Sequence, residues 1–185
     1  TLKCVISAGS KLRTETKYRL SEFTSNGFYE VYGTTEGAGT LLKPCHLPGK
    51  IESVGPPASC GEILILGSDD EVLPPGARGE IVGRNLFCAS GCLKRPDLNE
   101  ELVWFDPQGR LFFRTGDIGY LDEDGFLYVV DRKKDMIVSG GMNIYASDIE
   151  NVMAQHPDVL GAAVVAAPHA KWGETPYGFV ELRAS

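Results

Sequence analysis

The 185-residue sequence lacks several features that would assign it to a class directly. Its most apolar run, residues 159–167, is far shorter than the roughly 20 residues of a membrane-spanning helix, so no transmembrane segment is expected. It also lacks a basic excess, because the formal charge is −7 and the longest cationic run is Arg132, Lys133 and Lys134. Nucleic acids and anionic membranes are therefore not expected as partners. The first ten residues have no basic start of the kind that opens a signal peptide.

Cysteine and histidine are sparse and lack the spacing of metal sites. The five cysteines include no C-x-x-C pair, and the three histidines do not have zinc-ligand spacing. An odd number of scattered cysteines favours free, buried thiols over disulfides, and hence a reducing compartment. We therefore expect a cytoplasmic protein.

What is present is an ordinary globular composition, with 43% hydrophobic and 23% charged residues.

Residues 1–40 read as the end of an α/β region: a strand over 1–7, a helix over 16–27 that ends at Gly27, and a strand over 28–33. Residues 41–131 contain five short apolar runs separated by turn residues, which predicts an antiparallel β-barrel or a sandwich, with the barrel as the expected architecture.

The pattern changes again after residue 134. The stretch Ser147–Glu150 reads as a capping box that starts a helix, and apolar strands follow over 159–167 and 177–184. We thus expect a small α+β domain over 135–185. The predicted fold class is an α+β fragment of several subdomains.

Residues 32–37, YGTTEG, form the first candidate site. Thr34 and Thr35 can donate hydrogen bonds to phosphate oxygens, and Gly33 and Gly37 allow close approach of the backbone. The Glu36 carboxylate would repel phosphate unless a cation intervenes, and Mg²⁺ with its oxygen ligands would resolve that conflict. A polar loop with a solvated glutamate is the alternative interpretation.

A second candidate is Asp117 in RTGDIG, residues 114–119. An aspartate held at the end of a strand can accept hydrogen bonds from both hydroxyls of a ribose. The alternative is an aspartate that only organises its own turn. Arg132 could reach ribose or phosphate, or could be an ordinary surface cation near the acidic residues 122–124.

Four stretches together carry a family resemblance: SAGSKL, YGTTEG, residues 114–150, and HPDVLGAAVVAAPHAKWGE. In this order they resemble the AMP-forming acyl-CoA synthetases of the adenylate-forming superfamily, over essentially the whole chain. SAGSKL departs from the commoner SGGAPL, and Gly37 stands where many relatives carry threonine or serine. These departures blur the substrate assignment.

The resemblance implies a role for each matching position. For the nucleotide it implies a turn against adenine at Ala8 and Gly9, an aromatic contact at Tyr32, a phosphate contact at Thr35, a magnesium ligand at Glu36, a ribose-binding carboxylate at Asp117 and a ribose contact at Arg132. It also implies a hinge over 132–134 that includes Lys134, and a loop at Gly140 and Gly141 that lines the pantetheine tunnel of coenzyme A.

The implied activity is that of an acid–CoA ligase with a fatty or aryl acid, ATP and CoA as substrates, hence a place in fatty-acid metabolism. The family's phosphate loop and its adenylation lysine do not match any part of residues 1–185. We therefore expect an internal piece that does not form acyl-adenylate by itself. Its truncated strands and helices would expose apolar edges through which two copies could pair as a dimer. Two alternatives are an adenylation enzyme that loads a carrier protein and a vestigial nucleotide-binding or interaction module.

Overall fold

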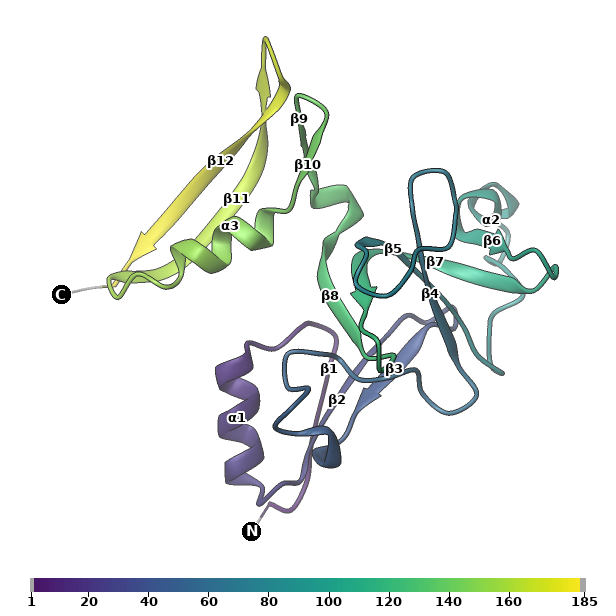
Figure 1. The fold of residues 1–185 in the computed structure, drawn as a ribbon, viewed down its shortest axis with the longest axis horizontal. Helices are drawn as coiled ribbons and strands as arrows, with labels where there is room; N and C mark the ends of the chain where they lie inside the picture. The colour runs from purple at the N-terminus through teal and green to yellow at the C-terminus, as the bar shows by residue number, and fades with distance from the viewer. Residues whose placement is uncertain (1, 184–185) are drawn as a thin grey trace. The chain divides into compact units, whose positions relative to one another are not determined.

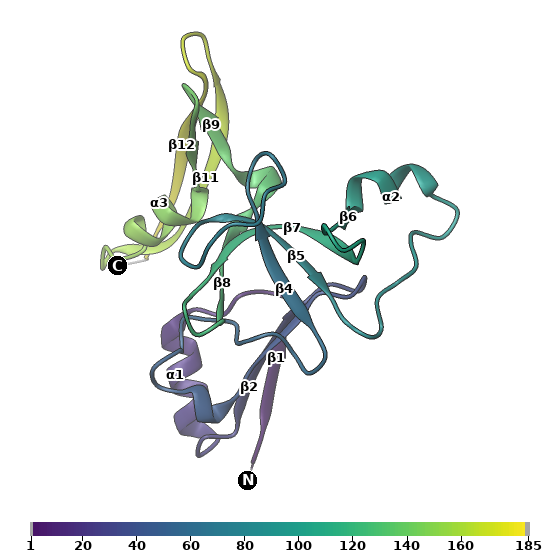
Figure 2. The same cartoon turned by 45° about the vertical axis from the view of Figure 1, so that its right-hand side comes forward.

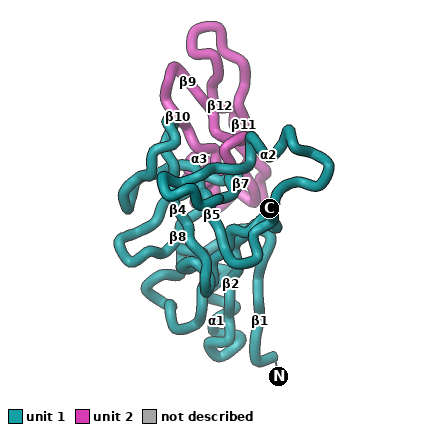
Figure 3. Tube along the Cα trace, turned by 90° about the vertical axis from the view of Figure 1, so that its right-hand side faces the viewer, with its two compact units in different colours: residues 1–129 teal, residues 130–185 magenta. Residues whose placement is uncertain are grey.

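A computed structural model describes residues 2–183. The chain forms two compact units, residues 1–129 and 130–185 (Figure 3). The finer division at residues 40, 131 and 134 stays a prediction. Within the described range no helix is long and apolar enough to cross a membrane.

The first unit begins with a three-stranded mixed sheet. Strand β1 (Val5–Ala8) runs parallel to β2 (Phe28–Gly33), and β3 (Gly39–Leu42) runs antiparallel to β2. Helix α1 (Thr14–Phe23) joins β1 to β2 and lies alongside them (Figures 1 and 2). The α/β start of the chain is thus present as predicted.

Helix α1 ends earlier than its sequence suggests. It stops at Phe23, and the left-handed residues that follow are Ser25 (φ 51°) and Asn26 (φ 68°). Gly27 therefore does not end the helix, and the prediction for it was wrong. Its lack of a side chain has another cause, because a Cβ there would lie 2.0 Å from the Lys3 carbonyl oxygen.

The rest of the first unit is an antiparallel sheet. Strands β4 (Glu62–Leu66), β5 (Gly79–Arg84), β7 (Leu111–Leu121) and β6 (Val103–Phe105) follow in that order, and β8 (Leu127–Arg132) pairs with β7. Helix α2 (Pro96–Leu102), which the sequence pattern did not indicate, precedes β6. The described strands form an open sheet, so the predicted antiparallel architecture is present but not closed into a barrel.

The core of this unit joins both sheets. Its buried residues come from the 34–38 turn, the 51–55 segment and the second sheet: Ala38, Val54, Ile63, Ile65, Ile81 and Leu127. Backbone hydrogen bonds from Val54 to Leu127 (2.8 Å) and from Leu127 to Gly55 (3.0 Å) fasten β8 to the same segment. The two sheets of the first unit therefore share one core, so residues on both can be held at fixed positions in a common site.

The second unit is a four-stranded sheet with one helix. After a 3-10 turn at Lys133–Asp135 come β9 (Ile137–Ser139), β10 (Met142–Ile144), α3 (Ala146–Met153), β11 (Val159–His169) and β12 (Gly173–Leu182). The sheet order is β10-β9-β12-β11. Helix α3 packs its apolar side on Ile137 and Val164. The predicted α+β character of this region is confirmed.

The capping box predicted for α3 was wrong. The helix begins at Ala146, one residue before the predicted cap at Ser147. The Ser147 hydroxyl donates to the carbonyl of Val130 (2.9 Å), and its N–H donates to Asp131 Oδ2 (3.0 Å). Glu150 accepts from the N–H of Val164 (2.8 Å). These side chains therefore bind distant backbone, and Asp131 serves the exposed helix N-terminus in place of a local cap.

The cysteines are free, as predicted, but they are not buried. Cys4, Cys45 and Cys60 are exposed, and Cys88 and Cys92 are half-buried.

Candidate functional site

Three predicted positions meet at one edge of the first sheet. Ala8 ends β1 and lies opposite Val31 in the parallel pairing with β2. Gly9 follows Ala8, and Tyr32 follows Val31 near the end of β2, so the carboxyl ends of the two parallel strands lie on the same side of the sheet. Ligands of α/β sheets bind beyond the carboxyl ends of parallel strands, and Ala8, Gly9 and Tyr32 occupy that place here.

The 34–38 turn extends from the same edge. The N–H of Thr34 donates to the carbonyl of Ala38 (3.0 Å), which closes the turn around Thr35 and Glu36. The carbonyl of Glu36 accepts from the N–H of Ala89 (2.9 Å), so the turn is also held from outside. Thr35 is exposed and Glu36 is half-buried. The turn thus presents a hydroxyl and a carboxylate on a fixed backbone.

The glycines of this turn have a packing role. A Cβ on Gly33 would lie 2.6 Å from the Ala38 carbonyl oxygen, and one on Gly37 would lie 2.4 Å from Cys88 Sγ. The space that a side chain would need is therefore filled by protein atoms. Packing thus gives these glycines a reason of their own, and close approach of a ligand to their backbone stays a prediction.

The hydroxyl of Thr34 is the unusual polar group of the turn. Within residues 2–183 its oxygen is buried and has no hydrogen-bond partner. A buried hydroxyl without a partner costs free energy, which a bound water or a ligand oxygen would offset. This orphaned hydroxyl is what a turn that binds phosphate oxygens would contain.

Asp117 lies in a bulge of β7. Glu80 pairs with Ile118 and Val82 with Arg114, so residues 115–117 stand opposite Ile81 alone. Gly116 occupies the left-handed region (φ 71°), which a residue with a side chain adopts only at a cost. The Thr115 hydroxyl donates to the Ile81 carbonyl (2.9 Å) and accepts from the Asp117 N–H (3.1 Å). The predicted strand end is thus a bulge within a longer strand, and bulges re-aim side chains.

The bulge brings Asp117 to Tyr32. The phenolic O–H of Tyr32 donates to Asp117 Oδ2 at 2.8 Å, and both side chains are partly buried. A second bond links the neighbouring turn to the second sheet, because Lys11 Nζ donates to the Val129 carbonyl (2.7 Å). The two sheets therefore meet where the predicted adenine and ribose contacts lie.

The 34–38 turn offers a magnesium ion one carboxylate, that of Glu36. The described part of the chain contains no group of three or more His, Cys, Asp or Glu side chains that could hold a metal. Magnesium is usually bound through one or two carboxylates together with substrate phosphates and waters. Glu36 on its fixed turn fits that mode of binding.

The other predicted positions belong to the second unit. Arg132 and Lys134 are exposed, and the N–H of Arg132 donates to Asp131 Oδ1 (2.8 Å). Gly140 (φ 57°) and Gly141 (φ 85°) form the two-residue turn between β9 and β10. Two successive positive φ angles define the hairpin turn that glycine favours, so this turn by itself requires the pair.

Two family profiles and several known proteins match this chain. The sequence profile of the AMP-binding enzyme family matches residues 1–93, half of the chain, and that of the AMP-binding enzyme C-terminal domain matches residues 148–185. The 2-succinylbenzoate–CoA ligase of Geobacillus kaustophilus is 42% identical over 157 residues, 84% of this chain and 31% of that protein. The enzyme of the same name from Bacillus cereus is 42% identical over 154 residues, again 31% of its length.

Solved structures give the same result. The amide bond synthetase McbA (K483A mutant) from Marinactinospora thermotolerans superposes with a TM-score of 0.85 at 31% identity, over 100% of this chain and 38% of that one. The o-succinylbenzoate CoA synthetase of Bacillus subtilis, in complex with its acyl-adenylate intermediate, gives 0.83 at 33% identity over 99% and 37%. The chain thus spans about a third of the curated relatives it matches. It belongs to the AMP-binding enzyme family.

Proposed function

We propose that this chain is part of an AMP-forming acid–CoA ligase, and that the first unit holds part of its adenylate site. The observation that carries the proposal is the 2.8 Å hydrogen bond between Tyr32 and Asp117, beside the carboxyl edge of β1 and β2. A carboxylate there can accept hydrogen bonds from ribose hydroxyls, while the Tyr32 ring offers a face to adenine.

The proposed roles in the 34–38 turn follow from its groups. The hydroxyls of Thr34 and Thr35 donate to phosphate oxygens, and Thr34 gains the partner that it lacks among residues 2–183. Glu36 holds Mg²⁺, which neutralises phosphate charge when it is bound. Because the turn is fixed by Ala38 and Ala89, these groups act from preset positions.

In the proposed reaction a carboxylate oxygen attacks the α-phosphorus of ATP, and pyrophosphate leaves. The thiol of CoA then attacks the carbonyl carbon of the acyl-adenylate, and AMP leaves. The second unit would change its orientation between these steps about residues 132–134, with Arg132 near the ribose and Gly140 and Gly141 near the pantetheine arm. These roles rest on the family resemblance.

The relatives favour CoA as the acceptor and an aryl acid as the substrate. The curated ligases are 42% identical to this chain and act on 2-succinylbenzoate by name. We therefore place the protein among aryl-acid–CoA ligases, ahead of fatty-acid ligases and of enzymes with amine or carrier-protein acceptors.

Binding of AMP to the 185-residue chain tests the proposal. We expect weak binding by wild type and at least about a tenfold loss in Asp117→Asn, since hydrogen bonds to a charged group are worth about 1.5–3 kcal/mol. Asp124→Asn, which changes an exposed carboxylate in another turn, serves as the matched control and should bind like wild type. Equal binding by Asp117→Asn and wild type would contradict the proposal.

A further inference from the structure

The hydroxyl of Tyr32 has no role in a contact between an aromatic ring and adenine. A phenylalanine would offer a similar face, yet this chain places a phenolic O–H at 2.8 Å from Asp117 Oδ2. A hydrogen bond from a neutral donor to an ionised carboxylate is about twice as strong as one between neutral groups. The hydroxyl therefore acts on Asp117.

The backbone on both sides of this bond is fixed. Tyr32 pairs with Thr40 between two further β2–β3 pairs, Val31–Leu41 and Gly33–Gly39. Asp117 is held by the Thr115 hydroxyl, which is itself bonded to Ile81. Neither residue can adjust its main chain without breaking a sheet. What remains variable is the orientation of the Asp117 side chain.

That orientation is not determined by the side chain itself. The terminal torsion of aspartate joins sp³ and sp² carbons, and it has a broad energy profile without sharp staggered minima. A carboxylate that must present its oxygens to two hydroxyls at once thus needs an outside partner. The Tyr32 O–H donates to one lone pair of Asp117 Oδ2, and this bond restricts rotation of the carboxylate.

We propose that Tyr32 is a positioning residue that orients Asp117 toward the two hydroxyls of a ribose, so that selection of ribonucleotides depends on the Tyr32 hydroxyl. This inference rests on the proposed function, because it concerns the same nucleotide site. It assigns the phenolic group a task that is separate from that of the ring.

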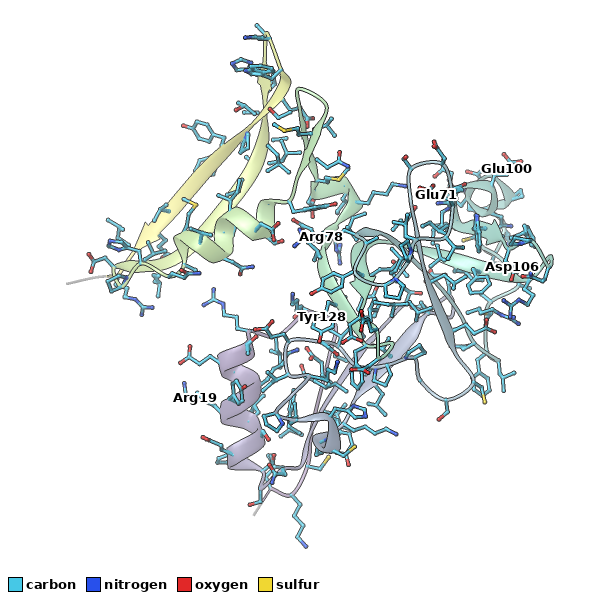
Figure 4. All side chains as sticks on the ribbon, in the orientation of Figure 1. Arg19, Glu71, Arg78, Glu100, Asp106 and Tyr128 are labelled. Atoms are coloured by element: carbon cyan, nitrogen blue, oxygen red, sulfur yellow. The ribbon has the colours of Figure 1, made fainter. Side chains whose placement is uncertain are left out.

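The test compares AMP with 2′,3′-dideoxy-AMP, which lacks both hydroxyls. Dissociation constants of both nucleotides are measured for the 185-residue chain as wild type, Tyr32→Phe, Asp117→Asn and the double variant. Tyr128→Phe is the matched control, because Tyr128 also donates to an aspartate, Asp122 (3.2 Å), elsewhere in the same unit. Tyr128 lies on β8 (Figure 4).

We expect wild type to prefer AMP, and Tyr32→Phe to reduce the ratio of the two dissociation constants by about fivefold, the effect of one lost hydrogen bond. Affinity for dideoxy-AMP should stay within about twofold, because the ring is kept. In the double variant the ratio should equal that of Asp117→Asn alone, since Tyr32 acts through Asp117. Tyr128→Phe should keep the wild-type ratio.

Each other outcome overturns a defined statement. An unchanged ratio in Tyr32→Phe, with AMP bound by wild type, overturns the positioning role and leaves the proposed function intact. Equal loss of affinity for both nucleotides also overturns it, because a general structural role has that effect. Absence of AMP binding by wild type overturns both. If Tyr32→Phe does not fold, Tyr32→Met, whose side chain has no hydrogen-bond donor, is measured in its place, with the ratio of the two dissociation constants as the criterion.

Discussion

Gly37 packs directly against Cys88, which lies in the loop after β5. A Cβ on Gly37 would lie 2.4 Å from Cys88 Sγ and 3.0 Å from its Cα, and Gly37 has a φ of 140°. We expect Gly37→Ala to lower the free energy of unfolding by about 1–3 kcal/mol, because overpacking displaces the loop backbone. Urea unfolding followed by circular dichroism measures the change.

Gly125→Ala is the matched control for this clash. Gly125 also has a positive φ (77°) but has no atom within 4 Å of the Cβ position. The Gly125→Ala variant therefore has the strain of a positive φ but no steric clash of its Cβ. A loss in Gly125→Ala as large as that in Gly37→Ala would show that contact with Cys88 does not hold the 34–38 turn.

A buried ion pair between Lys17 on α1 and Glu30 on β2 joins the helix to the first sheet. Lys17 Nζ lies 2.5 Å from Glu30 Oε2, and it also donates to the Ser53 carbonyl (3.0 Å). Removing one partner of a buried pair typically costs about 3–5 kcal/mol, because the other charge stays buried. We expect Lys17→Met to lower the free energy of unfolding by that amount, measured by urea titration.

The double variant Lys17→Met/Glu30→Leu should recover most of this loss, since apolar residues of similar volume often replace a buried pair without cost. The exposed pair Arg95–Asp97 is the control, and Arg95→Gln should leave the unfolding midpoint unchanged. A double variant that is as unstable as Lys17→Met would contradict this account of the pair.

Asp106, at the turn between β6 and β7 (Figure 4), should make the stability of the first unit depend on pH. Burial by itself raises the pKa of its carboxyl, but hydrogen bonds from Arg110 and from the N–H of Gln108 together hold that pKa below the ordinary 3.8. The folded pKa is thus lower than the unfolded one. The stabilisation is full above about pH 4 and is lost as the pH falls through the folded pKa.

We therefore expect wild type to lose more stability between pH 5 and pH 2 than Asp106→Asn does, with urea midpoints as the measurement. Asp69→Asn, at an exposed turn position, should follow wild type. Identical pH profiles for wild type and Asp106→Asn would refute the role given to Asp106.

The glycine pair between β9 and β10 allows a prediction for the second unit. A Cβ on Gly140 would lie 2.6 Å from Trp172 Cε3. A Cβ on Gly141 would have no atom within 4 Å. We expect Gly140→Ala to destabilise this unit more than Gly141→Ala, because both carry the backbone strain and only the first collides. Hydrogen exchange at the Gly140 N–H, which donates to the Trp172 carbonyl (2.9 Å), reports the difference.

The reverse order, with Gly141→Ala the more damaging, would mean that contact with Trp172 does not restrict this turn. In that case packing would not explain Gly140, and the positive φ angles of the turn would be the remaining structural reason for the pair.

Local patterns predicted the regular elements of this fold. The alternation over 28–33 and the apolar runs at 62–66 and 159–167 are strands, because residues at such positions bury their side chains by period. The sequence did not reveal whether the middle strands close into a barrel, since closure depends on the tilt and pairing of distant strands. Residues 96–102 form a helix that their short, polar pattern did not indicate.

The site shows the same division. The residue types at 34–36 and at 117 indicated phosphate and ribose chemistry, but the contact of Tyr32 with Asp117 spans 85 positions and has no local signature. The bulge had one signal, because an isolated glycine within a strand pattern, here Gly116, often marks a bulge. The predicted capping box does not form because Ser147 makes hydrogen bonds to Val130 and Asp131, which lie 16–17 positions earlier in the sequence.

The central claim is that the end of β1, the 34–38 turn and the β7 bulge form one nucleotide site. Titration of the ¹⁵N-labelled 185-residue chain with AMP, followed through its backbone amide NMR signals, tests this most directly. We predict saturable shifts with one common dissociation constant at Gly9, Gly37 and Asp117, and no comparable shift at Asp106. Shifts confined to one of the three segments, or dissociation constants that differ among them, would contradict the claim.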